Sequence, residues 1–187
     1  MSHNDQAFPW ETPPEIWRGL KSSNGRSRGQ VVSIFITPKA AGEMVSVTQV
    51  RAFADRGLEG DRFLRDSWAA LSRPDKAVSL IEEETLEIAA AELGVDSLAP
   101  ISRRNIVTRG VPLVELLDRE FTVGSARLRG LRLFEPCGHL VKLSGIAGIF
   151  KALEHRSGLK AAIVSDGLIR VDDAVALATA SLPAAGV

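Results

Sequence analysis

Short apolar runs rich in β-branched residues, each stopped by proline, glycine or another turn residue, recur from residue 30 to residue 177. Several of them alternate apolar and polar residues with a period of two, which is typical of half-buried strands. They predict about nine short strands at residues 30–36, 44–53, 77–81, 106–109, 120–123, 125–134, 159–164, 168–171 and 174–177. We expect the runs on either side of Asp166-Gly167 to form a hairpin. The fold class that follows is mostly β.

Helical patterns are fewer. Residues 82–93 carry three glutamates in the first turn, an apolar stripe at helical spacing and Gly94 as a stop signal, which predicts a helix with one face packed against another part of the protein. A short helical turn is expected at residues 112–117. A modest helix is expected at residues 145–155, ended by Gly158.

The length of 187 residues suits one domain. We place that domain at residues 30–178, between a mostly irregular N-terminal tail, residues 1–29, and a C-terminal tail, residues 179–187. Lys and Arg total 23 and Asp and Glu total 23, so no net charge favours nucleic acid or a membrane surface as a partner. A single cysteine excludes an internal disulfide, and no secretory signal pattern is present. We therefore expect a cytoplasmic protein.

That cysteine, Cys137, follows a predicted strand that Pro136 terminates. A lone cysteine is more often a small buried hydrophobe than a reactive group. Two neighbours favour function: Gly138 would let a ligand approach, and His139 would share a face with Cys137 if the chain were extended. Cys137 and His139 are the candidate catalytic residues.

Donor side chains precede the strand at residues 106–109, where Arg103, Arg104 and Asn105 lie in a row. Surface arginines on a loop are the simpler interpretation; an anion site is the functional one. The loop at residues 55–63 has two glycines three residues apart, but no dinucleotide-binding or Walker pattern occurs in the chain.

These motifs together resemble the MOSC domain, the C-terminal domain family of molybdenum cofactor sulfurases. The matching stretches are Gly57 to Phe63, Arg103 to Thr108, Glu135-Pro136-Cys137 and Gly158 to Asp173, in the order of the family. The resemblance implies a mostly β fold with flanking helices, a β-barrel of the MOSC or pyruvate kinase-barrel type.

The resemblance also implies site roles. Cys137 would supply a thiolate to the molybdenum of molybdenum cofactor (molybdopterin), and Arg62, Arg103 and Asn105 would hold the phosphate and pterin of the cofactor. Where the eukaryotic amidoxime-reducing branch has Lys-Ser on its first strand, this chain has Ser33-Ile34, so one phosphate contact is missing or supplied elsewhere.

Three functions remain open. The first is a cofactor-binding reductase of small N-hydroxylated compounds, served by an electron-donor protein. The second is a sulfur carrier in which Cys137 holds a persulfide from a cysteine desulfurase for metal-sulfur cluster or cofactor sulfuration, with pyridoxal phosphate (PLP) on that partner rather than on this chain. The third is a Cys137/His139 thiol hydrolase, which needs an orienting third group and an oxyanion hole. A homodimer is the alternative to a monomer.

Overall fold

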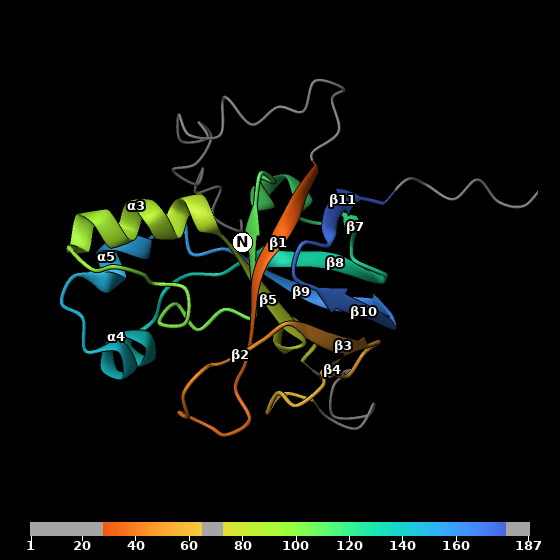
Figure 1. The fold of residues 1–187 in the computed structure, drawn as a ribbon, viewed down its shortest axis with the longest axis horizontal. Helices are drawn as coiled ribbons and strands as arrows, with labels where there is room; N and C mark the ends of the chain where they lie inside the picture. The colour runs from red at the N-terminus through yellow and green to blue at the C-terminus, as the bar shows by residue number, and fades with distance from the viewer. Residues whose placement is uncertain (1–27, 65–72, 179–187) are drawn as a thin grey trace, which may run out of the picture.

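The computed structural model describes residues 28–64 and 73–178. Their elements, labelled as in Figure 1, are β1 (Arg28–Ile36), β2 (Val45–Val47), β3 (Gln49–Phe53), β4 (Gly57–Leu58), η1 (Pro74–Lys76), β5 (Val78–Glu82), α3 (Glu83–Leu93), β6 (Ile106–Arg109), η2 (Leu113–Leu116), β7 (Glu120–Val123), β8 (Ala126–Leu133), α4 (Gly138–Ser144), α5 (Ile149–Leu153), β9 (Leu159–Ser165), β10 (Gly167–Arg170) and β11 (Ala174–Leu177).

Seven strands close into a barrel in the order β11-β7-β8-β9-β5-β6-β1, and β11 pairs back with β1. The β5–β6 pair is parallel, and the other strand pairs of the barrel are antiparallel. The predicted mostly β barrel with flanking helices is therefore confirmed. Closure leaves no unpaired edge within the ring, and β2 extends the sheet beyond it along β1.

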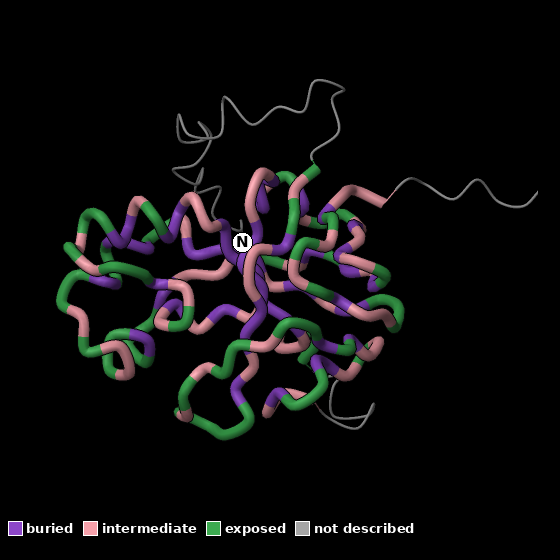
Figure 2. The backbone as a smooth tube through the Cα atoms, viewed as in Figure 1, coloured by how far each residue is buried: buried purple, intermediate pink, exposed green. Residues whose placement is uncertain are grey.

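The parallel pair β5–β6 is joined through α3, which lies on the side of the barrel that also carries α4 and α5 (Figure 1). All five residues of β5 are buried, because Leu80 faces the barrel interior and Ile81 faces the layer under the helices. Figure 2 shows buried residues concentrated where the strands and α3 meet. The predicted stop at Gly94 is confirmed by a left-handed backbone with φ of 66°.

Two strand predictions need correction. The run at residues 44–53 divides at Thr48 into β2, which pairs with β1, and β3, which belongs to a separate sheet ordered β10-β3-β4. The hairpin around Asp166-Gly167 does not form: β8 pairs with β9 as far as Ser165, and on the other edge of β9 the Ile163 carbonyl accepts the Asp55 N–H at 3.1 Å. β10 pairs with β3 instead, and the Asp166 carboxylate accepts a hydrogen bond from the Ala54 N–H at 2.6 Å.

The helix predicted at residues 145–155 is present but shorter than expected. Gly145 and Gly148 adopt positive φ angles of 64° and 83°, which interrupt a helix, so the region forms α4 before them and α5 after them. α4 begins directly after Cys137, which places the cysteine at the helix boundary.

The predicted tails fall almost wholly outside the described residues, except that Arg28 and Gly29 are the first residues of β1. Among the residues that the structure describes, no helix has the length and apolar character needed to cross a membrane.

Candidate functional site

All five residues proposed for the site line one pocket of about 150 Å³, at the end of the barrel where β8 ends and β9 and β6 begin. They are Arg62, Arg103, Asn105, Cys137 and His139. The structure therefore brings together side chains from three separate segments of the chain. The structure shows where these five side chains lie, and the catalytic and cofactor-binding roles assigned to them stay predictions.

Cys137 is exposed at this pocket, between the end of β8 and the start of α4. Its backbone is extended, with φ of −140° and ψ of 165°, and its carbonyl oxygen accepts the Leu140 N–H at 3.0 Å. The preceding Pro136 is buried. The thiol is therefore held on a fixed backbone and open to small molecules, unlike a cysteine packed in an apolar core.

Asp61 and Asn105 form the polar framework beneath the pocket. Asp61 Oδ2 accepts the Thr37 N–H at 2.9 Å, and Asp61 Oδ1 accepts the Phe63 N–H at 2.9 Å. Asn105 Nδ2 donates to Asp61 Oδ2 at 3.2 Å. These bonds join the loop after β4 to the end of β1 and to the start of β6, so they fix where Arg62 lies.

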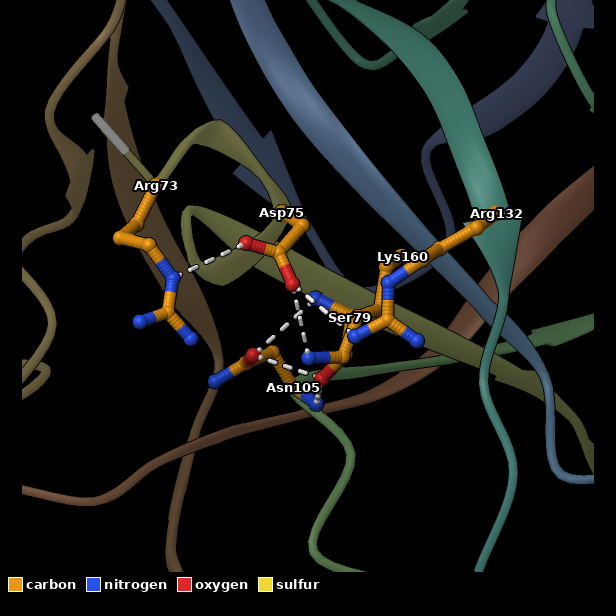
Figure 3. Close-up of polar contacts among 6 residues, drawn as sticks. All are labelled: Arg73, Asp75, Ser79, Asn105, Arg132 and Lys160. Carbon is orange, nitrogen blue, oxygen red and sulfur yellow. Dashed lines mark hydrogen bonds and ion pairs between the residues drawn. The ribbon is translucent and has the colours of Figure 1, made fainter. Parts of the chain in front are cut away.

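The Asn105 amide has partners for all of its hydrogen-bonding capacity. Its Oδ1 accepts from the Ser79 N–H at 3.1 Å and from Ser79 Oγ at 2.9 Å, a contact visible in Figure 3. Its Nδ2 donates to the Phe35 carbonyl as well as to Asp61. Asn105 lines the pocket, but its bonds make it a positioning residue; Asp61, which the sequence interpretation left out, shares that role.

Arg62 and Arg103 differ from the other pocket arginine because each has a buried nitrogen, Arg62 Nε and Arg103 Nη2, for which the described part of the chain offers no hydrogen-bond partner. Buried donors without acceptors are rare in folded proteins and costly to leave unpaired. Burial and the neighbouring charge of Arg62 lower the pKa of Arg103 below its ordinary value, and Asp61 opposes this in part. Arg103 also has a left-handed backbone with φ of 60°, uncommon for a residue with a side chain. Two adjacent guanidinium groups in this state suit an anion.

Arg104 lies on the wall of the same pocket but is only 2% exposed. It donates from Nε to the Ser157 carbonyl at 2.9 Å and from Nη1 to the Ser102 carbonyl at 2.7 Å, and its Nη2 bonds Ser157 Oγ. Its guanidinium carbon lies 3.5 Å from the centre of the Phe134 ring. Burial lowers the pKa of Arg104 to about 9, while the charges of Cys137 and Glu135 act in the opposite direction. Cys137 therefore lies within electrostatic reach of a fixed, buried cation.

A second charged cluster, drawn in Figure 3, lies beside Arg104. Asp75 accepts from Arg132 at 3.0 Å and from Lys160 at 3.4 Å. Partial burial raises the pKa of Asp75, but the hydrogen bonds and charges of Arg132 and Lys160 outweigh it and hold the pKa below its ordinary value. Burial and the Arg132 charge lower the pKa of Lys160, whose Nζ lies 4.5 Å from the Phe134 ring centre. The sequence interpretation did not find this cluster, because its members are far apart along the chain.

His139 reaches the pocket by a route different from the one expected. The chain after Cys137 is helical and not extended, so His139 lies on the first turn of α4, where it is exposed. No hydrogen-bond partner for its ring occurs within residues 28–64 and 73–178, so the orienting group that a thiol hydrolase needs is not found there. Glu135, the nearest carboxylate in sequence, accepts instead from the backbone N–H of His155 at 2.9 Å.

The described ranges contain no group of three or more His, Cys, Asp and Glu side chains placed to hold a metal ion. Ser33 and Ile34 do not line the pocket, and Ile34 is fully buried in the barrel core, so the first strand does not supply the absent phosphate contact. Arg103 also borders a neighbouring hollow of about 340 Å³ with Met44, Ile101 and Leu143.

The fold and site are those of a small closed β-barrel protein with an exposed cysteine and two arginine side chains lining a pocket at one end of the barrel. The family model described as MOSC domain matches residues 68–176, more than half of the chain, and the chain belongs to this family. The resemblance noted in the sequence is thereby confirmed.

Solved structures show the same fold. The YuaD protein from Bacillus subtilis matches with a TM-score of 0.65 and 16% identity, over 82% of this chain and 98% of that one. YiiM from Geobacillus stearothermophilus matches with a TM-score of 0.65 and 18% identity, over 83% and 78% of the two chains. YiiM from Escherichia coli matches with a TM-score of 0.58 and 21% identity, over 80% and 70%. A search of curated proteins found no significant match.

Proposed function

We propose that this protein binds molybdenum cofactor in the pocket beside Cys137 and reduces small N-hydroxylated compounds, with electrons supplied by a partner redox protein. The observation that supports it most directly is the pair of buried, unpartnered donors, Arg62 Nε and Arg103 Nη2, on the wall that also carries Cys137. A bound phosphate would satisfy both donors, and bidentate binding of phosphate suits guanidinium groups.

The donor set fits the cofactor. Cys137 offers one soft thiolate in an exposed position, and the described residues hold no cluster that could bind a metal unaided. A metal at Cys137 would therefore need further ligands, which the sulfur atoms of the pterin can provide. When bound, the cofactor supplies a metal that carries two electrons to the N–O bond.

Each pocket residue named below has a defined task in this proposal. Arg62 and Arg103 hold the phosphate, and Cys137 ligates the metal. Asn105 and Asp61 keep the loop that carries Arg62 against β6. His139, exposed at the same pocket, holds the proton that the leaving hydroxyl group takes up as water forms.

The test is the molybdenum and pterin content of protein expressed in a host that makes the cofactor. Arg103→Ala should lose a charge-assisted bond of about 1.5 to 3 kcal/mol, or roughly ten- to hundredfold in affinity. Cys137→Ser should keep pterin but lose molybdenum. Arg129→Ala, an exposed β8 arginine outside the pocket, is the matched control and should load like wild type.

Wild type that carries neither molybdenum nor pterin would overturn the proposal. Equal loading of Arg103→Ala and wild type would mean that the anion site has been misplaced.

The exposure of Cys137 also favours a second candidate, the sulfur carrier, because a persulfide must be reachable by a donor. Cofactor-free wild type that gains one sulfur atom at Cys137 when incubated with a cysteine desulfurase and cysteine would put that function first.

A further inference from the structure

The pocket beside Cys137 has a surplus of positive charge, although the whole chain has none. Lys and Arg equal Asp and Glu in the full sequence, at 23 each. The pocket wall carries three carboxylates, and its five cationic side chains are Arg62, Lys76, Arg103, Arg104 and Lys160. The cationic surplus is therefore local, and low-dielectric walls strengthen the field of such a cluster.

The three carboxylates of this wall are all engaged by other groups of the protein. Each accepts hydrogen bonds that hold the fold in place, and their partners are Thr37, Phe63 and Asn105 for Asp61, Arg132 and Lys160 for Asp75, and His155 for Glu135. They offset part of the positive charge of Arg103, Arg104 and Lys160, and two cationic side chains remain in excess over the three carboxylates.

Lys76 is the cation of this wall whose side chain shows no hydrogen bond or ion pair among the described residues and to which the proposed function gives no cofactor contact. It follows Asp75 at the end of η1, is half-buried, and its Nζ lies 5.4 Å from the centre of the Phe63 ring. Arg62 lies against the same ring at 4.4 Å. Within residues 28–64 and 73–178, no acidic side chain pairs with Lys76.

Contacts link Lys76 to Cys137 around the pocket wall. Asp75, the residue before Lys76, bonds Lys160, and Lys160 lies against Phe134, three residues before Cys137. Arg62 also lies against the Phe63 ring, and its charge acts on Arg103. Lys76 therefore lines the same pocket as the guanidinium pair and the thiol.

We propose that the pocket admits anionic small molecules in preference to neutral ones, and that Lys76 binds the carboxylate or phosphate group of the ligand. As a statement about the substrate this rests on the proposed function: the N-hydroxylated compound would carry an acidic group. The charge preference itself belongs to the pocket and can be measured on protein that holds no cofactor.

The sole cysteine makes that measurement direct. Full-length protein from a host that lacks the cofactor is reduced and then alkylated at Cys137 with either iodoacetate, an anion, or iodoacetamide, its neutral analogue. The ratio of the two rate constants reports the local preference for negative charge, and glutathione gives the reference ratio. Lys76→Gln is the test variant, Lys76→Arg is the rescue variant, and Lys142→Gln is the control, because Lys142 lies on α4 outside the pocket.

Wild type should show a ratio above that of glutathione at low salt, falling toward it as salt screens the cations. Lys76→Gln should lower the ratio by about threefold, as expected for one charge acting over several ångströms at high effective dielectric, with the iodoacetamide rate unchanged. Lys76→Arg and Lys142→Gln should match wild type. A wild-type ratio equal to that of glutathione, or equal ratios for Lys76→Gln and Lys142→Gln, would overturn the proposal. Molybdenum content is independent of this ratio, so either proposal can fail alone.

Discussion

Asn105 Nδ2 donates to Asp61 Oδ2 over 3.2 Å, and this bond joins the residue directly before β6 to the loop that follows β4. Asp61 is 8% exposed and accepts from three donors in all, on both carboxylate oxygens. An asparagine at this position has a single acceptor oxygen, so its NH₂ group would face at least one of the donors.

Asp61→Asn should therefore destabilise the fold by about 1 to 3 kcal/mol, the cost of leaving a buried donor unsatisfied. Urea unfolding followed by far-UV circular dichroism measures the change. Asp96→Asn, at an exposed position, is the control and should stay near wild type. If both variants unfold at the same urea concentration, the Asp61 network does not stabilise the loop.

Glu82, at the end of β5, makes the stability of the fold depend on pH, and the direction of this dependence follows from its pKa. Complete burial raises its pKa from 4.5 to about 8, and the charge of Glu84 adds to the rise, while backbone hydrogen bonds, one from the Leu113 N–H, act against it. Between pH 4.5 and pH 8 the folded state keeps this proton and the unfolded state has lost it. The stability linked to Glu82 is therefore fully present below pH 4.5 and is lost as pH rises toward 8.

Glu82→Gln keeps an acceptor for Leu113 but cannot ionise. It should be more stable than wild type at pH 8 by on the order of 1 to 3 kcal/mol, and the gain should shrink toward pH 5. Urea titrations at several pH values compare the two proteins, with Glu154→Gln as the exposed control. A gain that does not vary with pH would mean that Glu82 is not the titrating group.

Arg104 should influence both stability and the thiol. Arg104→Met removes three hydrogen bonds and leaves the carbonyl groups of Ser102 and Ser157 without this donor, which should cost about 2 to 4 kcal/mol. It also removes the fixed positive charge near Cys137, so iodoacetamide should label Cys137 roughly three- to tenfold more slowly at neutral pH. Arg104→Lys keeps the charge and should label nearer the wild-type rate. Equal labelling of the two variants, both folded, would show that the charge does not reach the thiol.

The segments that sequence patterns predicted well are those whose structure depends on near neighbours. The strand β5, the helix α3 and its stop at Gly94 form one continuous local signal, and the break between β7 and β8 falls at Gly124 as expected. The β9–β10 hairpin prediction was wrong because strand partners depend on the whole fold: β9 pairs with β8 as far as Ser165, and β10 pairs with β3 from the early part of the chain.

Some residues of the candidate site could be predicted from local sequence motifs, and others could not. Arg62, Arg103 and Cys137 were selected from motifs that resemble a family, and the pocket brings them together. Lys160 and Asp75 are 85 residues apart, and nothing in either local sequence marks them as partners. Arg104 was noted in the sequence as a donor between Arg103 and Asn105. Its burial against Phe134 and its bonds to Ser157 follow from tertiary packing, which the local sequence does not reveal.

The pairing of Arg28 with Ala176 has a consequence for synthesis of the chain, because β11 is the last strand of the described residues and lies between β1 and β7. A nascent chain that ends before β11 presents unpaired edges on both of those strands. Such edges promote pairing between different molecules. The barrel can therefore close only after residues 174–177 have been synthesised and can pair with both β1 and β7.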